Sequence, residues 1–421
     1  MLPGIDLCLD PTRLRVIAAG KAAAAMVRPI YELARGVRGV VVAPARPRSL
    51  PPGARGLRWI AAEHPLPGRG SFRAGRAVLD EVQAAAPDDT ILVLLSGGAS
   101  SLLECPAPGL TTAEVRAAYR VLLTAGLSIV DMNRIRSCLS ALKGGGLRLA
   151  AGRRRVITLA LSDVPGDDPA AIGSGPTVLP PRVTTGRATG SRRLDAALHL
   201  LRAGGLDRKL SPRVRAMLER EEGAARGTRS AGLTRAAFRA PSVYVVVGSN
   251  ADARRAAAAE ARRLGYAVRH RAALITGEAT RAGTSFGRGL GPVPAGRPVC
   301  VVAGGESTVQ IAGPAGQGGR NQEFVIAASR AVRAPGWVLL AAGTDGRDGP
   351  TPAAGALLDA TVLGRVGRGL LDAALRHHDV YPLLARLGAL IETGPTGTNV
   401  MDLALALSFE RRVLAAPLSA R

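Results

Sequence analysis

The amino-acid sequence predicts an α/β protein with two domains. The chain has 421 residues, whereas a typical domain has roughly 100–200. Short apolar strands alternate with turns rich in Gly, Ser, Asp or Asn and then with helical stretches. This pattern lapses once, between about residues 178 and 240, where we expect one domain to give way to the next.

The strand–turn–helix unit recurs along the chain in six long segments and two shorter ones. The long segments are residues 15–26, 90–103, 154–168, 242–265, 297–309 and 336–349, and the shorter strands are 39–45 and 57–65. Near-continuous apolar strands between helices are typical of parallel sheets covered on both faces. In such sheets ligands bind beyond the carboxyl ends of the strands, which is where every polar turn of this chain lies.

We place the domain boundary at the lapse in the pattern. The expected domains are residues 1–240, with a linker-like stretch over 178–240, and residues 241–421. The strand that begins at Ser242 would open or rejoin the second unit.

The net charge of +24 comes from 56 basic and 32 acidic residues. Only three of the basic residues are lysines, Lys21, Lys143 and Lys209, so the excess reflects an Arg-rich composition. The arginines are scattered along the sequence. A surface for single-stranded nucleic acid would require aromatic side chains interleaved with them, and these are missing. We therefore expect no nucleic-acid partner.

The cysteines and the hydropathy indicate a cytoplasmic protein. Cys8, Cys105, Cys138 and Cys300 are too far apart for a zinc site. The N-terminal residues lack a basic region followed by an apolar core, and no uncharged apolar run of membrane-spanning length occurs, so we expect neither export nor membrane insertion.

Two of the rare lysines stand at element ends. Lys21 follows Gly20 at a strand end and precedes a helix, so its ammonium and the first helical N–H groups would favour an anion. The alternative is a solvated lysine in a first helical turn. Lys143, in LKGGG, is either a phosphate contact or a dipole partner at a helix end.

The string LLSGGASS offers donors for phosphate oxygens at another strand end. Its candidate contacts are Ser96, Gly97, Gly98 and Ser100. The string is neither a GxxxxGK[ST] loop nor a GxSxG elbow, and HExxH and a GxGxxG after a strand do not occur in the sequence.

Asparagine is scarce in this composition, and all four asparagines lie in polar strings. They are Asn133, Asn250, Asn321 and Asn399. Each is either a turn or cap residue or a ligand contact, and it is less expected that all four are caps. His64, also at a strand end, is either a turn anchor or a ligand contact.

Carboxylates gather in three further turns, SDVPGDD, GGEST and GTDGRDG. They are Asp163, Asp167, Asp168, Glu306, Asp345 and Asp348. Such groups either bond to backbone N–H groups, serve as a base for a substrate hydroxyl, or hold Mg²⁺ with phosphate oxygens. Arg320, between glycines and Asn-Gln-Glu, is a candidate clamp for a carboxylate or phosphoryl group.

Taken together, the strings resemble the class II glycerate kinases, the glycerate 2-kinase family with a C-terminal MOFRL domain. The resemblance runs nearly end to end and is carried by AAGKAA, EHPLP, LLSGGASSLL, NRIRSCLSALKGG, LSDVPGDDPAAIGSGPT, VVGSNADA, GGESTV, GGRNQE, GTDGRDGPTPAAGA and TGPTGTNVMDL. It implies a Rossmann-like α/β/α N-terminal domain and a smaller C-terminal α/β domain whose MOFRL region covers about residues 297–403. The active site would lie in the cleft between them.

The resemblance also implies an activity: ATP and D-glycerate give ADP and 2-phosphoglycerate, with Mg²⁺. It makes Lys21 and Arg320 catalytic and Asp163 and Asp345 contacts of the metal. The substrate and phosphate contacts would be Ser96, Gly97, Gly98, Ser100, Asn133, Lys143, Asn250, Glu306, Asn321, Thr344 and Asn399.

Several alternatives stay open at this point. They are a hydroxypyruvate reductase, a kinase giving 3-phosphoglycerate, a binding protein without turnover, and either a monomer or a homodimer. The chain also departs from the family pattern, with Gly68 after HPLP and Ser137-Cys138 before LS, which bears on substrate scope.

Overall fold

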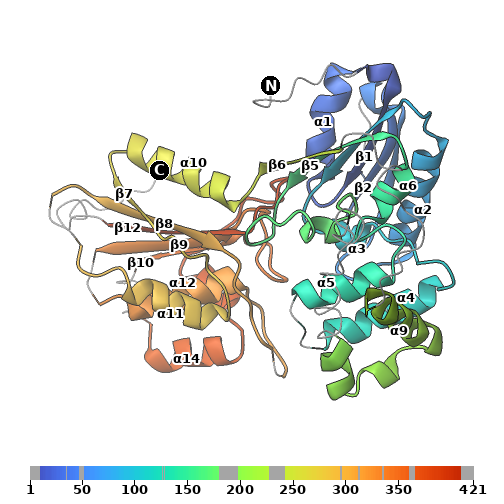
Figure 1. Cartoon of the computed structure of the whole chain (residues 1–421). Coiled ribbons are helices and arrows are strands. Elements are labelled where there is room, and N and C mark those ends of the chain that lie inside the picture. Colours follow the sequence, from blue (N-terminus) through green and yellow to red (C-terminus); the bar gives the residue numbers. More distant parts are fainter. Residues whose placement is uncertain are drawn as a thin grey trace. The chain divides into compact units, whose positions relative to one another are not determined.

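The computed structural model of the chain forms two compact units, Met1–Val247 and Gly248–Arg421, each with its own six-stranded sheet (Figure 1). The structure describes residues 10–408 except 35, 47–51, 126, 128, 180–197, 227–241, 294–295, 312, 334–335 and 360–365. The strand that starts at Ser242 belongs to the sheet of the first unit, so the units divide after Val247 rather than after residue 240.

The sheet of unit 1 has the strand order β3-β2-β1-β4-β5-β6. Its strands are β1 (Leu14–Ala19), β2 (Arg38–Ala43), β3 (Leu57–Ala61), β4 (Thr90–Leu95), β5 (Arg155–Leu161) and β6 (Ser242–Gly248). The pairs from β3 through β5 are parallel, as the sequence predicts. The direction of winding reverses between β1 and β4, and the carboxyl ends of strands at such a switch point are where doubly wound sheets bind ligands.

Helices cover both faces of this sheet because the strands bury both. Helix α1 (Ala23–Leu33) packs against Val16 and Ala18 on one face. Helices α2 (Arg69–Ala84) and α6 (Gly146–Ala151) cover Ile17 on the other. Neighbouring strand residues thus point to opposite helical layers, as the period of two along a strand requires.

A helical layer completes unit 1 and corrects part of the expected linker. Helices α4 (Thr112–Leu123), α5 (Ile129–Cys138) and α9 (Pro212–Arg226) share an apolar cluster (Figure 1). Leu198, Leu201, Leu210, Val214, Met217 and Leu218 contribute to it. Residues 198–226 are therefore core-forming helix and turn, while the rest of the expected linker lies largely outside the described residues.

The sheet of unit 2 is mixed, with the order β11-β10-β9-β12-β8-β7. Its strands are β7 (Ala267–His270), β8 (Val299–Gly305), β9 (Trp337–Gly343), β10 (Gly355–Asp359), β11 (Leu390–Ile391) and β12 (Asp402–Ser408). The expectation of parallel pairing holds in this sheet only for β7 with β8, and the other pairs are antiparallel. Strand β12, which the sequence pattern did not reveal, lies between β8 and β9 and runs antiparallel to both.

Helices α11 (Ala279–Arg288) and α12 (Arg320–Ala331) lie on one face of this sheet and α10 (Asn250–Arg263) on the other (Figure 1). Side chains at Gly283 and Gly287 would collide with carbonyl oxygens of α12, so these glycines let α11 and α12 pack closely. The remaining short elements are η1 (Pro11–Arg13), η2 (Pro52–Ala54), α3 (Ala99–Leu102), η3 (Ile172–Ser174), η4 (Asp207–Lys209), α14 (Arg368–Arg376) and α15 (Tyr381–Arg386).

Candidate active site

The turn after β1 and the turn after β4 interlock at the switch point of unit 1. The backbone N–H of Lys21 donates to the carbonyl of Gly97 at 2.8 Å. Gly20 has φ +132, and a side chain there would collide with Ser96, so only glycine lets the two turns approach this closely. The sheet topology thus places Lys21, as the sequence predicts, at the edge where doubly wound folds bind ligands.

A third turn reaches the same place. Gly98 has φ +84, and a Cβ added to it would stand 3.2 Å from Cδ2 of His64 and 3.5 Å from Cγ of Lys21. His64 follows β3 and precedes a cis peptide bond to Pro65. Lys21, His64 and the Gly97–Gly98 turn therefore form one cluster, here called the switch-point cluster, which combines a cation with glycine backbone that a ligand can approach.

The remaining residues of the LLSGGASS string have structural partners. Ser96 is fully buried, and its hydroxyl accepts the N–H of Ala22 at 3.0 Å, beside the start of α1. Ser96 is therefore a helix-end anchor and not the ligand contact that we expected. The Ser100 hydroxyl shares a hydrogen bond of 2.7 Å with that of Ser174, which is itself in the left-handed region at φ +63.

Lys143 does not fill the first of its two expected roles, that of a phosphate contact. Its side chain is 1% exposed and its ammonium contacts Glu104 and the hydroxyl of Tyr119 inside unit 1. Asn133 lies on α5, and its Oδ1 is buried without a hydrogen-bond partner among the described residues. A buried acceptor of this kind is the sort of atom that a ligand or water would satisfy.

In unit 2 the first residue of α12 and the first residue of β12 form an ion pair. Arg320 donates from Nε to Oδ2 of Asp402 at 2.6 Å and from Nη2 to Oδ1 at 2.9 Å. Its Nη1 lies 2.9 Å from Oε1 of Glu306, which follows β8. Burial lowers the pKa of Arg320, but the hydrogen bond to Asp402 and the negative charges of the surrounding carboxylates together outweigh burial, so the pKa lies above its ordinary value.

Two of the expected ligand asparagines anchor the fold instead. Asn250 is 2% exposed and donates from Nδ2 to the carbonyls of Val400 and Asp402, both at 2.9 Å. Asn321 is 3% exposed and donates from its backbone N–H and its Nδ2 to Asp348. The side-chain N–H donors of both asparagines thus bind protein groups, whereas Oδ1 of Asn250 is buried without a hydrogen-bond partner among the described residues.

Two further expected contacts hold the loop before β12: Asn399 lies within it, and Thr344 follows β9 and binds it. The hydroxyl of Thr344 donates to the carbonyl of Met401 at 2.7 Å and accepts the N–H of Val400 at 2.8 Å. Asn399 accepts the N–H of Met401 at 3.3 Å through Oδ1. Both side chains shape the approach to Asp402, one residue beyond this loop.

The two expected metal contacts lie in different units. Asp163 follows β5, and Asp345 follows β9, where its Oδ1 accepts the N–H of Arg347 at 3.1 Å. Within the described ranges, no group of three or more His, Cys, Asp or Glu side chains is arranged to hold a metal ion. A protein cage for a metal is therefore not preformed in this part of the chain.

Sequence reasoning missed Asp402. Its motif, TGTNVMD, points to the asparagine, because asparagine is the scarce residue type in this sequence. The usable signal is the run DLALALS, a continuous stretch of Leu and Ala of strand length that begins directly after that aspartate.

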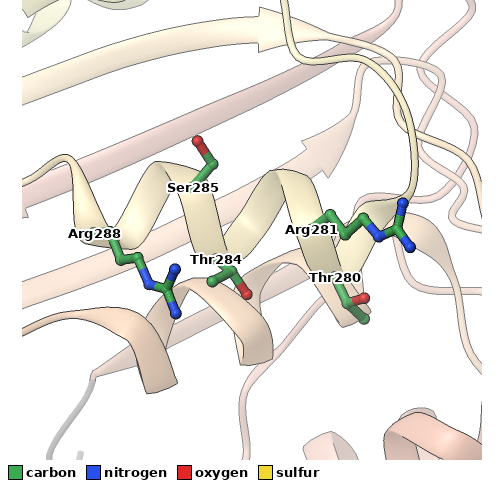
Figure 2. Close-up of a pocket in the computed structure, with 5 residues that line it drawn as sticks. All are labelled: Thr280, Arg281, Thr284, Ser285 and Arg288. Atoms are coloured by element: carbon green, nitrogen blue, oxygen red, sulfur yellow. The ribbon is translucent and has the colours of Figure 1, made fainter.

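A hollow of about 430 Å³ lies on the outer side of α11, away from all these residues. Figure 2 shows its lining, Thr280, Arg281, Thr284, Ser285 and Arg288, along one helix. None of the residues expected from the sequence contributes to it, and it is an open surface depression, so we do not assign the active site there.

The fold defines an α/β protein whose first unit is a doubly wound sheet, and the switch-point cluster lies at the carboxyl edge where sheets of this class bind ligands. Residues 5–219 match the family described as "Domain of unknown function (DUF4147)", and residues 299–402 match the MOFRL family. The chain belongs to the glycerate kinase family that combines these two regions.

Relatives with established names cover most of the chain. The "Glycerate 2-kinase" of Pyrococcus horikoshii is 33% identical over 95% of this chain and 88% of its own length. The "Glycerate kinase" of Homo sapiens is 33% identical over 90% of this chain and 78% of its own. A protein of Agrobacterium vitis whose name proposes hydroxypyruvate reductase is 37% identical over 93% of this chain and 86% of its own.

The fold matches a solved glycerate kinase. The crystal structure of glycerate kinase from Thermotoga maritima superposes with a TM-score of 0.75 at 31% identity, covering 94% of this chain and 92% of that one. The two-domain α/β expectation is therefore confirmed. As for membranes, none of the helices in the described ranges has the length and hydropathy to cross one.

Proposed function

We propose that this glycerate kinase transfers the terminal phosphoryl group of ATP to the 2-hydroxyl of D-glycerate, giving ADP and 2-phosphoglycerate. The observation that carries the proposal is the switch-point cluster: Lys21 is hydrogen-bonded through its backbone to Gly97, and both stand where a doubly wound sheet receives its ligand. The name of the Pyrococcus horikoshii relative supports the 2-position.

The proposed role of Lys21 is electrostatic. A phosphoryl group in transfer carries negative charge on its three equatorial oxygens, and fixed cations and N–H groups stabilise that charge best where water is displaced. Lys21 supplies a point charge, and the glycine turn allows backbone to approach the phosphate. Gly97, Gly98, Ser100 and Asn133 are the proposed neighbouring contacts in unit 1.

Arg320 is the proposed catalytic cation of unit 2. Its planar guanidinium suits a carboxylate or a transferring phosphoryl group, and its side chain is 29% exposed, so a ligand can reach it. Glu306, Thr344 and Asn399 lie in the turns around it and are proposed to shape the surroundings of the ligand. The proposal requires that variants at Lys21 and at Arg320 impair the same reaction.

Mg²⁺ fits the donor chemistry of these turns although no three-carboxylate cluster is preformed among the residues that the structure describes. Mg²⁺ is usually held by one or two carboxylates together with substrate phosphates. Asp163 and Asp345 are the proposed carboxylate contacts. Asp345 lies beside Gly343, where an added Cβ would stand 3.1 Å from Oδ1 of Asp345. When bound, the ion would neutralise phosphate charge.

One coupled assay tests the proposed function. The chain is incubated with ATP, Mg²⁺ and D-glycerate, and the product is read through enolase alone or after phosphoglycerate mutase is added. Product that enolase accepts directly supports 2-phosphoglycerate. Product that requires the mutase would instead identify 3-phosphoglycerate.

Hydroxypyruvate reduction is the second candidate, because the Agrobacterium vitis relative carries that name. The sequence has no dinucleotide fingerprint after a strand. NADH oxidation with hydroxypyruvate and without ATP would favour the reductase.

A cytoplasmic location remains a prediction, which cell fractionation tests.

A further inference from the structure

Asp402 holds the guanidinium of Arg320 along one edge. Two parallel hydrogen bonds join Nε and Nη2 of Arg320 to the two carboxylate oxygens of Asp402, at 2.6 and 2.9 Å. Such a bidentate pair fixes the plane of the guanidinium as well as its distance. Arg320 is the first residue of α12 and Asp402 the first of β12, so the pair joins two elements far apart in sequence.

The pairing leaves part of the guanidinium for a ligand. A guanidinium has five N–H donors. Asp402 engages one on Nε and one on Nη2, and Glu306 lies next to Nη1. One N–H on each terminal nitrogen remains on the side away from Asp402. The direction of those two donors is therefore set by the carboxylate behind them.

The carboxylate is itself firmly held. The side chain of Asp402 is only 6% exposed, and its backbone pairs with Gly305 of β8 and Gly343 of β9. The buried amide of Asn250 binds the carbonyl of Asp402, and Thr344 binds the carbonyl of Met401. Asp402 is therefore held by the strands on both of its sides, and a precise orientation of Arg320 requires a partner held in this way.

The residue before Asp402 adds a further constraint. Met401 is 2% exposed and has φ +67, in the left-handed region that a side chain of this size rarely adopts. Strained backbone of this kind persists where the surrounding structure over-determines it, and it clusters at functional sites. Here it directs the chain so that β12 begins with its carboxylate beside Arg320.

We propose that Asp402 is the positioning residue of Arg320: it orients the guanidinium so that the two remaining N–H groups meet the anionic group of the substrate. The proposal rests on the proposed catalytic function of Arg320. Asp402 does not itself touch the substrate. An asparagine at this position would offer one acceptor and one donor, so it would accept from one Arg320 nitrogen and oppose the other.

A double-mutant cycle in the full-length chain tests the proposal. The variants are Asp402→Asn, Arg320→Gln and the double variant, with Glu392→Gln, an exposed carboxylate of the same unit, as the control. For each, kcat and KM for D-glycerate and ATP are measured, together with thermal unfolding. If Asp402→Asn does not fold, Asp402→Glu, which keeps the charge but displaces it, replaces it in the cycle.

We expect Asp402→Asn to lower kcat by more than about tenfold, with KM for ATP changing by less than about threefold. In the Arg320→Gln background the same change should lower kcat by less than about threefold, because the residue it orients is already gone. A merely structural role predicts an equal loss in both backgrounds that follows the folded fraction, and this outcome would overturn the proposal. If the unsubstituted chain shows no turnover of glycerate, the proposed function fails instead.

Discussion

Lys143 and Glu104 form an ion pair that is closed off from solvent inside unit 1, with exposed side-chain fractions of 1% and 0%. The hydroxyl of Tyr119 contacts both groups, and the guanidinium of Arg136 stands 4.6 Å above the centre of the Tyr119 ring. Burial lowers the pKa of Lys143 and raises that of Tyr119. The pair ties the segment after α3 to the turn before α6 and so supports the layer of α4, α5 and α9.

We predict that Lys143→Met strongly destabilises the chain. It leaves the Glu104 carboxylate buried without its cation, and breaking a buried pair on one side typically costs about 3–5 kcal/mol. The double variant Lys143→Met/Glu104→Gln should lose less, because no unpaired charge remains. Urea unfolding at neutral pH measures both.

The matched control is Lys209→Met, since Lys209 is an exposed lysine of the same unit. Its stability should stay within about 0.5 kcal/mol of the unsubstituted chain. If Lys143→Met is equally mild, the ion pair contributes nothing that the surrounding packing does not already supply.

Much of the fold could be predicted from the sequence because its parallel strands are apolar throughout and end in polar turns. The eight expected strands are all present, and Lys21 lies at a strand end as predicted. Strand β12 was missed because its short run of alternating Leu and Ala follows a long polar loop. Its position between β8 and β9 arises from long-range pairing, which local patterns do not encode.

The candidate site was harder to predict because rare polar residues include both candidate ligand contacts and residues that bind other groups inside the protein. Lys21 and Lys143 are two of only three lysines in the sequence, yet one stands beside Gly98 in the switch-point cluster and the other is buried beside Glu104. Asn250 and Asn321 likewise bind protein groups. A scarce polar residue in a biased composition has a local reason to be present, but only the fold separates an internal partner from a ligand.

Replacing the lysine of the switch-point cluster tests the catalytic assignment directly. We predict that Lys21→Ala lowers kcat/KM for glycerate phosphorylation by more than tenfold, which corresponds to about 1.4 kcal/mol of transition-state stabilisation. Lys21→Arg should retain more activity, because the charge remains while its shape changes. Steady-state kinetics with Lys209→Ala as the control measures this, and turnover of Lys21→Ala within tenfold of the unsubstituted chain contradicts the assignment.

Two glycines with similar backbone angles, Gly98 and Gly109, allow the effect of backbone strain to be measured apart from an effect on the candidate site. Gly98 has φ +84 and Gly109 has φ +90, but a Cβ at Gly98 would meet His64 and Lys21 whereas one at Gly109 meets nothing within 4 Å. We predict that both Ala variants lose about 1–2 kcal/mol of stability, because alanine is strained in the left-handed region. Only Gly98→Ala should also lower kcat/KM by more than about tenfold.

The comparison requires unfolding curves and kinetics for the same two preparations. Equal activity losses would mean that strain alone explains the effect. An active Gly98→Ala variant would show that ligands do not use the space beside His64 and Lys21.

Asp348 supplies a prediction about pH. Its carboxylate accepts the N–H groups of Asn321 and Gln322 at the start of α12, but it is only 1% exposed. Burial outweighs these hydrogen bonds and raises the pKa of Asp348 from 3.8 to about 6. The folded chain therefore takes up a proton at Asp348 at a pH where the unfolded chain does not.

Because the folded state binds this proton more tightly, the contribution of Asp348 to stability increases as the pH falls from 7 towards the unfolded pKa. We predict that the unsubstituted chain gains about 2 kcal/mol relative to Asp348→Asn between pH 7 and pH 4.5, since one pKa unit corresponds to about 1.4 kcal/mol. Urea unfolding of both chains across this range measures the difference, in which the titrating groups that do not interact with Asp348 cancel. A relative loss on acidification would mean instead that the hydrogen bonds from the helix outweigh burial and that the ionised carboxylate stabilises the fold.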